Sequence, residues 1–433
     1  MTAHATKNGL LARQLEALSD ARRRTLALVE GISEEDLVRV HSPLMSPLAW
    51  DLGHIAAFED LWLVHRFAGR SMLREDLANV YDAFETPRVH RGDLPFLGPE
   101  EARAYLADVR ELAVSLARDR GIGDGTLHEM VVRHEHQHCE TMLQTIQLAR
   151  LAGYPAAAGI ARTPTVTPSS DGTTGLELLE VPAGPCTVGA PPTGFAYDNE
   201  RPRHRVSLDR FSIAKAPVTN RAYLEFIRAA GYRRRELWSE EGWEWKERDK
   251  VERPGGWTED LRAEWRLGAL QPLDPASPVV HVSWFEADAF ARAHDARLPN
   301  ELEWEKAASW DPATAEARSY PWGEDAPVPG LHGNFDQLHR GPVGASSYPA
   351  GDSPYGVSDM IGQVWEWTAS TFDGYPGFSA YPYPEYSEVF FGQGYRVLKG
   401  GSWATRARVA TPSFRNWDFP QRRQIFAGIR IAR

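Results

Sequence analysis

The pattern of apolar residues changes about a third of the way along the chain. Up to residue 151, apolar side chains recur every three or four positions over long stretches, which is the spacing of amphipathic helices. From residue 176 onward, apolar runs are short and are separated by many Gly, Pro and Trp residues. A chain of 433 residues is also too long for a single hydrophobic core. We therefore expect two domains of different architecture.

The helical spacing predicts a bundle in the first part of the chain. The segments that carry it are 10–31, 47–67, 99–118 and 127–151. Helices of this kind pack as a four-helix bundle, and bundles build metal sites from side chains on facing helices. We assign residues 1–155 to this domain. Residues 156–175 are rich in Ala, Pro, Thr, Ser and Gly and have no period, which predicts a linker.

Residues 176–433 are expected to form a loop-rich α+β domain. The predicted helices of this part are 220–230, 283–294 and 301–309. The clearest strand candidates are 206–208, 211–213 and 397–398. The fold class expected for the whole chain is therefore α+β, with a helical bundle followed by a domain dominated by loops.

Composition excludes several classes of function. The net charge of −11 and the lack of a long Lys/Arg run argue against a nucleic-acid partner. No apolar stretch approaches the roughly 18 residues of a membrane span, and residues 1–18 lack the apolar core of a signal peptide. With only two cysteines, Cys139 and Cys186, a disulfide framework is excluded. We expect a cytoplasmic protein that acts on small molecules, as a monomer.

Histidines supply the densest chemical signal. In the sequence HEHQH at 134–138, His134 and His138 are four residues apart and share one helix face, whereas His136 lies on another. Such a pair alone is more often a surface or core feature than a metal site. His54 changes this balance, because it sits inside an apolar helical segment where an unpaired imidazole is costly. We predict that His54, His134 and His138 bind one metal ion.

The residue types alone leave the identity of the metal open. Three neutral imidazoles with open coordination positions suit zinc, iron or nickel. They leave the ion its full positive charge. A thiol substrate would be attracted to that charge and deprotonated on binding.

Longer motifs resemble known families. The C-terminal part resembles the formylglycine-generating, sulfatase-modifying-factor family through the segments 198–202 (DNERP), 217–220 (PVTN), 297–305 (RLPNELEWE), 321–323 (PWG), 364–367 (VWEW) and 400–403 (GGSW). The N-terminal part resembles DinB-type metal-binding bundles. The combination is similar to the ergothioneine-biosynthesis sulfoxide synthases, the hercynine oxygenase family, most specifically through 50–54 (WDLGH), 134–138 (HEHQH), 414–418 (FRNWD) and 422–428 (RRQIFAG).

This resemblance implies a fold, a cofactor and a reaction. The fold would be a DinB-like four-helix bundle followed by a C-type-lectin-like, formylglycine-generating-enzyme-like domain. The cofactor would be Fe(2+). The enzyme would join hercynine to γ-glutamylcysteine with O2, forming a C–S bond at the imidazole carbon between the two nitrogens. One oxygen atom would end in the sulfoxide and the other in water.

The resemblance also implies roles for individual residues. It assigns the three iron ligands to His54, His134 and His138, the residues already selected by spacing. The catalytic tyrosine would be Tyr383. The residues implied to bind the thiol substrate are Arg88, Arg91, Asp418 and, more weakly matched, Arg422. The residues implied to surround hercynine are Gln137, Tyr386, Asn416 and Trp417.

One departure from the formylglycine generators is clear. Those enzymes use a reactive cysteine pair late in the domain, and here no cysteine follows Cys186. Three alternatives to the sulfoxide synthase remain open. They are a DinB-type metal-dependent thiol transferase, a related oxygenase that uses cysteine or a selenium donor, and a binding protein without catalysis.

Overall fold

In the computed structural model, residues 2–151 and 174–433 are described. The chain divides into two compact units, Met1–Gly159 together with Leu267–Ala269, and Ile160–Arg266 together with Leu270–Arg433. The predicted linker, residues 156–175, lies outside the described residues except for its last two positions. No helix in the described ranges combines the length and apolar character that crossing a bilayer requires.

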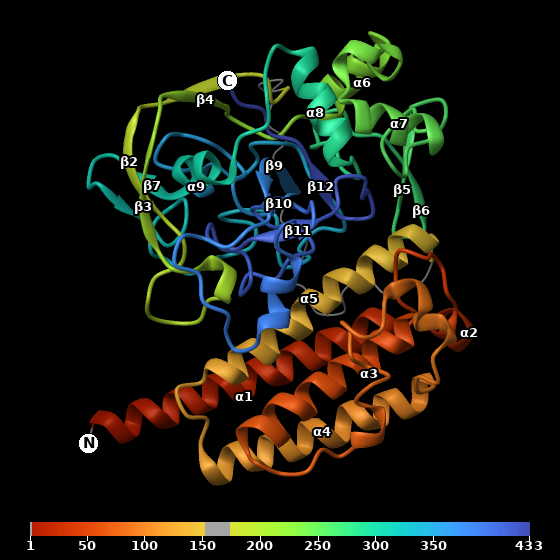
Figure 1. Ribbon diagram of the computed structural model, residues 1–433, viewed down its shortest axis with the longest axis vertical. Coiled ribbons are helices and arrows are strands. Elements are labelled where there is room, and N and C mark those ends of the chain that lie inside the picture. The colour runs from red at the N-terminus through yellow and green to blue at the C-terminus, as the bar shows by residue number, and fades with distance from the viewer. Residues whose placement is uncertain (1, 152–173) are drawn as a thin grey trace. The chain divides into compact units, whose positions relative to one another are not determined.

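The first unit is helical (Figure 1). Its long helices are α1 (Thr2–Val29), α3 (Leu48–Glu59), α4 (Pro99–Arg120) and α5 (Thr126–Ala149). Its shorter helices are α2 (Glu34–Val38), η2 (Glu75–Leu77) and η3 (Arg88–Asp93). Each predicted helical segment coincides with one long helix. The segment 47–67 is split, because α3 continues as a π-helix, η1 (Asp60–Phe67).

Local sequence signals set the ends of these helices. Helix α4 starts with Pro99, whose fixed φ suits a first helical position and whose missing N–H would be unpaired there anyway. It ends at Gly121, which adopts φ 75°. Arg118 and Arg120 in its last turn face the negative end of the helix dipole.

A buried charge cluster joins the long helices of this unit. It consists of Arg22 from α1, Glu59 from α3, Arg110 from α4 and Glu135 from α5. Arg22 contacts Glu59 at 2.8 Å and Glu135 at 2.9 Å. Arg110 contacts the same two carboxylates at 2.6 and 2.8 Å. Burial alone would raise the pKa of Glu135, but the two arginines lower it to about 2. Glu135 is therefore charged near neutral pH.

The second unit is built from small sheets and short helices joined by loops. Its largest sheet has the strand order β11 (Asn416–Asp418), β10 (Arg396–Lys399), β9 (Trp365–Thr371) and β12 (Ala427–Gly428). Strand β10 runs antiparallel to both neighbours, and β12 runs parallel to β9.

Paired strands make up the remaining sheets. They are β1 (Leu178–Val181) with β4 (Phe211–Ala214), β2 (Gly184–Val188) with β3 (His204–Leu208), β5 (Ala263–Arg266) with β6 (Ala269–Pro272), and β7 (Trp310–Asp311) with β8 (Glu316–Ala317). The helices are α6 (Asn220–Arg228), α7 (Glu240–Arg248), α8 (Trp284–Ala293) and α9 (Glu301–Ser309). All three predicted helices and all three predicted strands are present. Helix α7 was not predicted, and among the described strands only β3, β4 and β10 correspond to predicted ones.

Tryptophans and paired charges fill the core of the second unit. Trp304, Trp367 and Trp403 are among its largest fully buried side chains. Glu366 accepts a hydrogen bond from Trp304 Nε1 at 2.6 Å and pairs with buried Arg430 at 2.7 Å. These contacts show that the tryptophan motifs of the second unit serve its core.

The buried charge cluster leads to a prediction about stability. Replacing Arg110 with Ala leaves Glu59 and Glu135 sharing one arginine in a buried setting. Removing one partner of a buried ion pair lowers the free energy of unfolding by about 3–5 kcal/mol. Urea unfolding followed by circular dichroism measures this loss.

The matched control is Arg103→Ala on the same helix. Arg103 pairs with the largely exposed Glu34 at 3.0 Å, and exposed pairs contribute less than about 1 kcal/mol. Equal losses for the two variants would contradict a special role of the cluster.

Candidate metal centre

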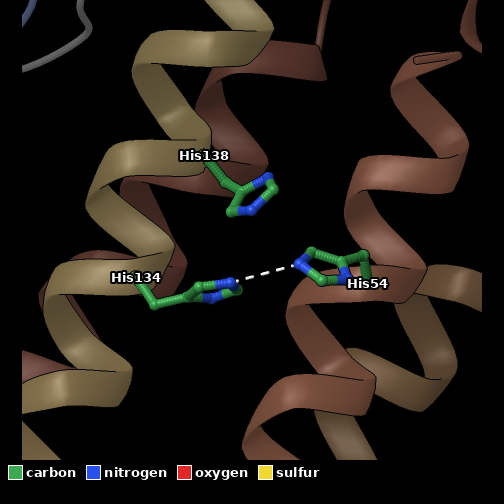
Figure 2. Close-up of side chains that lie close together, drawn as sticks. All are labelled: His54, His134 and His138. Carbon is green, nitrogen blue, oxygen red and sulfur yellow. Dashed lines mark hydrogen bonds between the residues drawn. The ribbon is translucent and has the colours of Figure 1, made fainter. Parts of the chain in front are cut away.

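Three histidine rings converge inside the first unit. His54 projects from α3, and His134 and His138 project from α5 toward it (Figure 2). The ligand nitrogens of all three lie within 4.8 Å of one another. Nε2 of His54 lies 3.1 Å from Nε2 of His134. Among the described residues, this is the one group of three or more His, Cys, Asp or Glu side chains placed to bind a metal ion.

The three histidines that the spacing selected lie close together. His134 and His138 are one helical turn apart, and their ring centroids lie 4.5 Å from each other. His136 and Glu140, also on α5, are buried and take no part in the group. Cys139 is buried and its Sγ lies 3.3 Å from Thr25 Oγ1, in agreement with a packing role.

A backbone carbonyl orients His54. Nδ1 of His54 lies 2.7 Å from the carbonyl oxygen of Tyr81. Because a carbonyl oxygen only accepts, a neutral His54 carries its proton on Nδ1 and directs the lone pair of Nε2 toward the other two rings. Gly53 makes this possible, since a Cβ at that position would lie 2.1 Å from Cζ of Tyr81.

A carboxylate orients His138. Nδ1 of His138 lies 3.2 Å from Oδ1 of Asp51, a fully buried residue of α3. A carboxylate accepts hydrogen bonds, so Asp51 is placed to accept one from an N–H on this ring nitrogen. Second-sphere acceptors of this kind are typical of histidines that bind metals.

Aromatic rings cover the remaining sides. Phe58 stacks on His134 with ring centroids 3.6 Å apart and an interplanar angle of 7°. Trp50 stacks on His54 with centroids 4.9 Å apart. These contacts limit rotation of the His54 and His134 rings and exclude water from one side of each.

The electrostatics favour neutral imidazoles. Burial lowers the pKa of His54 and of His134 well below the ordinary value, and the neighbouring His138 lowers both further. A metal ligand has to be deprotonated, so these groups are ready to bind near neutral pH.

The distances fit a single ion. The Nε2 atoms of His54 and His134 lie 3.1 Å apart, and the ligand nitrogens of all three histidines lie within 4.8 Å of one another, so these three residues would hold the ion together. The donor set therefore fits a divalent transition metal with open coordination positions.

Arg88 and Arg91 lie on η3 of the same unit. Arg91 is buried, and its guanidinium lies 3.8 Å from the centroid of Trp50, the ring that stacks on His54. Its hydrogen bonds to Thr86 O, Ser46 Oγ and Ala83 O engage three of its N–H groups. Burial lowers the pKa of Arg91 to about 10, and the nearby charge of Arg88 adds to this effect. The neighbouring positive charges of Arg88 and Arg91 favour binding of an anion beside them.

Arg88 is less constrained than Arg91. It is half-buried, and its hydrogen bond to Leu44 O has a length of 3.5 Å. Its guanidinium can therefore turn toward a carboxylate at little cost.

Gln137 is the other residue of the first unit for which the resemblance implied a role. It lies on α5 one position before His138 and is half-buried. Because it is three residues after His134, its side chain lies on a neighbouring part of the same helix face.

In the second unit, the implied residues Asn416, Trp417 and Asp418 form the edge strand β11. Asp418 accepts a hydrogen bond from Gln424 Nε2 at 3.0 Å and pairs with Arg422 at 3.5 Å. The structure thus brings Asp418 and Arg422 together.

The loop with Tyr383 and Tyr386 is anchored to the second unit. The ring of Tyr386 stacks on Tyr197 at 4.5 Å and lies edge-on to Tyr383 at 6.1 Å and to Trp417 at 6.3 Å. Directly after it, Ser387 donates to Asp198 at 2.5 Å. Tyr383, Tyr386 and Trp417 therefore belong to one aromatic group.

Several residues of the metal centre escaped the sequence reasoning. Asp51 was in view within WDLGH, three residues before His54, and that spacing places both on one side of α3. The contacts of Phe58 and of the Tyr81 carbonyl depend on how separate segments pack, so they carried no signal of this kind.

The geometry predicts that His138→Ala abolishes binding of a divalent metal, because the site loses one of three ligands and the partner of Asp51. Metal analysis and Fe(II) titration measure the loss. The matched control is His136→Gln on the same helix, which should retain one ion per chain. A His138→Ala protein with wild-type affinity would contradict the site.

Comparison with known proteins agrees with both halves of this description. The sulfatase-modifying factor enzyme 1-like domain family matches residues 164–433, and the DinB superfamily matches residues 17–142. Among solved structures, PvdO from Pseudomonas aeruginosa is 21% identical with a TM-score of 0.42, over 63% of this chain and 96% of that one.

Curated relatives cover nearly the full length. The hercynine oxygenase of Mycolicibacterium thermoresistibile is 46% identical, over 98% of this chain and 94% of that protein. The hercynine oxygenase of Mycobacterium tuberculosis is 44% identical, over 96% of this chain and 97% of that protein. The chain therefore belongs to the hercynine oxygenase family, and it is an enzyme of the oxygenase class.

Proposed function

We propose that this enzyme is an iron(II)- and O2-dependent sulfoxide synthase that joins hercynine and γ-glutamylcysteine in ergothioneine biosynthesis. The observation that carries the proposal is the convergence of His54, His134 and His138 without a carboxylate among the ligands. Relatives named for hercynine support the identity of one substrate. In the overall reaction, the thiol, the imidazole C–H and O2 give the sulfoxide and one water.

Three neutral ligands suit this chemistry. They leave the charge of the metal ion uncompensated at the first sphere, which favours binding of a thiolate. Iron(II) held there would supply the redox chemistry that couples O2 reduction to C–S bond formation and sulfur oxidation. The chain's own task is to orient the rings: the Tyr81 carbonyl supports His54, and Asp51 supports His138.

Arg88 and Arg91 are proposed to hold the carboxylates of γ-glutamylcysteine. Guanidinium groups bind carboxylates through two parallel hydrogen bonds. Arg91 keeps one N–H on each terminal nitrogen without a partner among the described residues. Asp418, supported by Arg422, is proposed to meet the amino group. A donor with two carboxylates and one amine matches this set better than free cysteine.

Tyr383 is proposed as the proton donor of the reaction, because a phenol can give a proton to reduced oxygen. Tyr386 and Trp417 offer aromatic faces to the trimethylammonium group of hercynine. Asn416 offers an amide to its carboxylate, and Gln137 a hydrogen bond to its imidazole. We place the enzyme in the cytoplasm, which fits two cysteines that form no disulfide, and we propose that it acts as a monomer.

The direct test is aerobic incubation of the iron-loaded protein with hercynine and γ-glutamylcysteine, with products identified by mass. The expected product is the sulfoxide, and it should be absent without O2. Parallel reactions replace γ-glutamylcysteine with cysteine or with a selenium donor. Turnover that persists without O2 would instead indicate a DinB-type thiol transferase.

Arg88→Leu should raise KM for γ-glutamylcysteine at least tenfold and leave KM for hercynine nearly unchanged, because one carboxylate contact of about 1.5–3 kcal/mol is lost. Steady-state kinetics with each substrate varied in turn measures the effect. Arg70→Leu, which removes an exposed arginine of the same unit, is the control. Equal changes for both substrates would remove the assigned role.

Tyr383→Phe should bind both substrates with near wild-type affinity and lose sulfoxide formation by about 100-fold or more, the scale of general acid catalysis. Product analysis and substrate titration separate the two effects. Tyr381→Phe is the matched control, since the Tyr381 side chain is 50% exposed two residues away in the same loop. An unchanged sulfoxide yield in Tyr383→Phe would show that another group donates the proton.

A further inference from the structure

Asp51 is a buried carboxylate that has no proposed contact with a substrate. It lies in the first turn of α3, with no solvent exposure. Its Oδ1 atom contacts His138 Nδ1 at 3.2 Å, and its Oδ2 atom is buried without a hydrogen-bond partner among the described residues. A buried carboxylate with one oxygen unsatisfied is costly, so its presence calls for a compensating charge.

No nearby cationic group among the described residues supplies the hydrogen bond that Asp51 Oδ2 lacks. Arg91 lies close enough to Asp51 for the negative charge of Asp51 to raise the pKa of Arg91. However, the hydrogen bonds described for the Arg91 guanidinium go to Thr86 O, Ser46 Oγ and Ala83 O. The group that Asp51 contacts directly is His138, whose other ring nitrogen faces the metal centre.

We propose that Asp51 is a positioning residue that fixes the tautomer of His138 and supplies the negative charge missing from the ligand set. This inference rests on the proposed metal site. Asp51 holds the Nδ1 proton of His138, so Nε2 points to the centre. Its charge offsets part of the charge of a divalent ion bound by three neutral rings.

The three ligands are therefore not equivalent. An imidazole that donates to a carboxylate is more basic than one that donates to a carbonyl, so His138 binds the ion more strongly than His54 does. His134 stacks on Phe58, which is apolar. The added negative charge also favours the higher oxidation state of the metal.

A second buried aspartate shows what a purely structural role looks like. Asp60, where η1 begins, is also fully buried. Its two oxygens accept hydrogen bonds from Leu73 N, Arg74 N and Tyr105 OH at 2.8–3.2 Å. Asp60 is thus satisfied by the fold, whereas Asp51 keeps one oxygen unpaired beside a metal ligand.

The test compares Asp51→Asn with Asp60→Asn in the full-length protein. Fe(II) affinity is measured anaerobically by competition with a chelator, and the Fe(III)/Fe(II) potential by redox titration. Asp51→Asn should weaken Fe(II) binding roughly 10–100-fold and raise the potential. Asp60→Asn should unfold more easily and keep wild-type affinity. Wild-type affinity and potential in Asp51→Asn would overturn the inference.

A measurement on the wild-type protein covers the case in which Asp51→Asn does not fold. In the zinc-loaded protein, ¹⁵N NMR of the imidazoles should show His138 protonated at Nδ1 and bound through Nε2. The opposite tautomer would overturn the inference. Neither experiment depends on hercynine turnover, so an iron-binding protein that forms no sulfoxide would refute the proposed function alone.

Discussion

The buried charge cluster of Arg22, Glu59, Arg110 and Glu135 ties the long helices of the first unit to one another. Each helix contributes one charge, and each arginine contacts both carboxylates. Rotating any of these helices by one residue would leave a charge buried without its partners, which costs several kcal/mol. The pairing therefore selects one rotational setting for each helix.

That setting is the one the metal centre needs. Glu135 directly follows His134 on α5, and Glu59 lies five residues after His54 on α3. A ligand set tolerates errors of only a few tenths of an ångström in its bond lengths. Charges that lock α3 against α5 thus hold the two halves of the site at a constant separation. Tyr81 and Asp51 then fix the rings themselves.

The metal centre and the arginine pair share one scaffold. Trp50 stacks on His54 and also lies against the guanidinium of Arg91. A substrate whose thiolate meets the metal and whose carboxylates meet Arg88 and Arg91 would be held at two points of the same unit. In the second unit, the candidate residues lie on a three-residue strand and an irregular loop, not on long helices. Hydrogen bonds from Ser387 and buried pairs such as Glu301 with Arg415 hold those segments in place.

The sequence determined the parts of the protein that depend on local periodicity. It located α1, α3, α4 and α5, and it located α9 to the residue. In the structure, Asn300 and Glu303 form a capping box at the start of α9. It also selected His54, His134 and His138, since spacing along a helix fixes which side chains share a face. Strand β9 escaped it, because a strand buried on both sides lacks the alternation that marks a half-exposed one.

Only the tertiary structure decided which groups surround the ligands. The contact between Asp51 and His138 spans 87 residues, and that between Tyr81 and His54 spans 27. The stacking of Arg91 on Trp50 likewise joins separate segments. Such contacts depend on how helices and loops pack, and a single sequence carries no periodic signal for them. The three histidines of the candidate site were therefore predictable from the sequence, while the groups that contact them were decided by the fold.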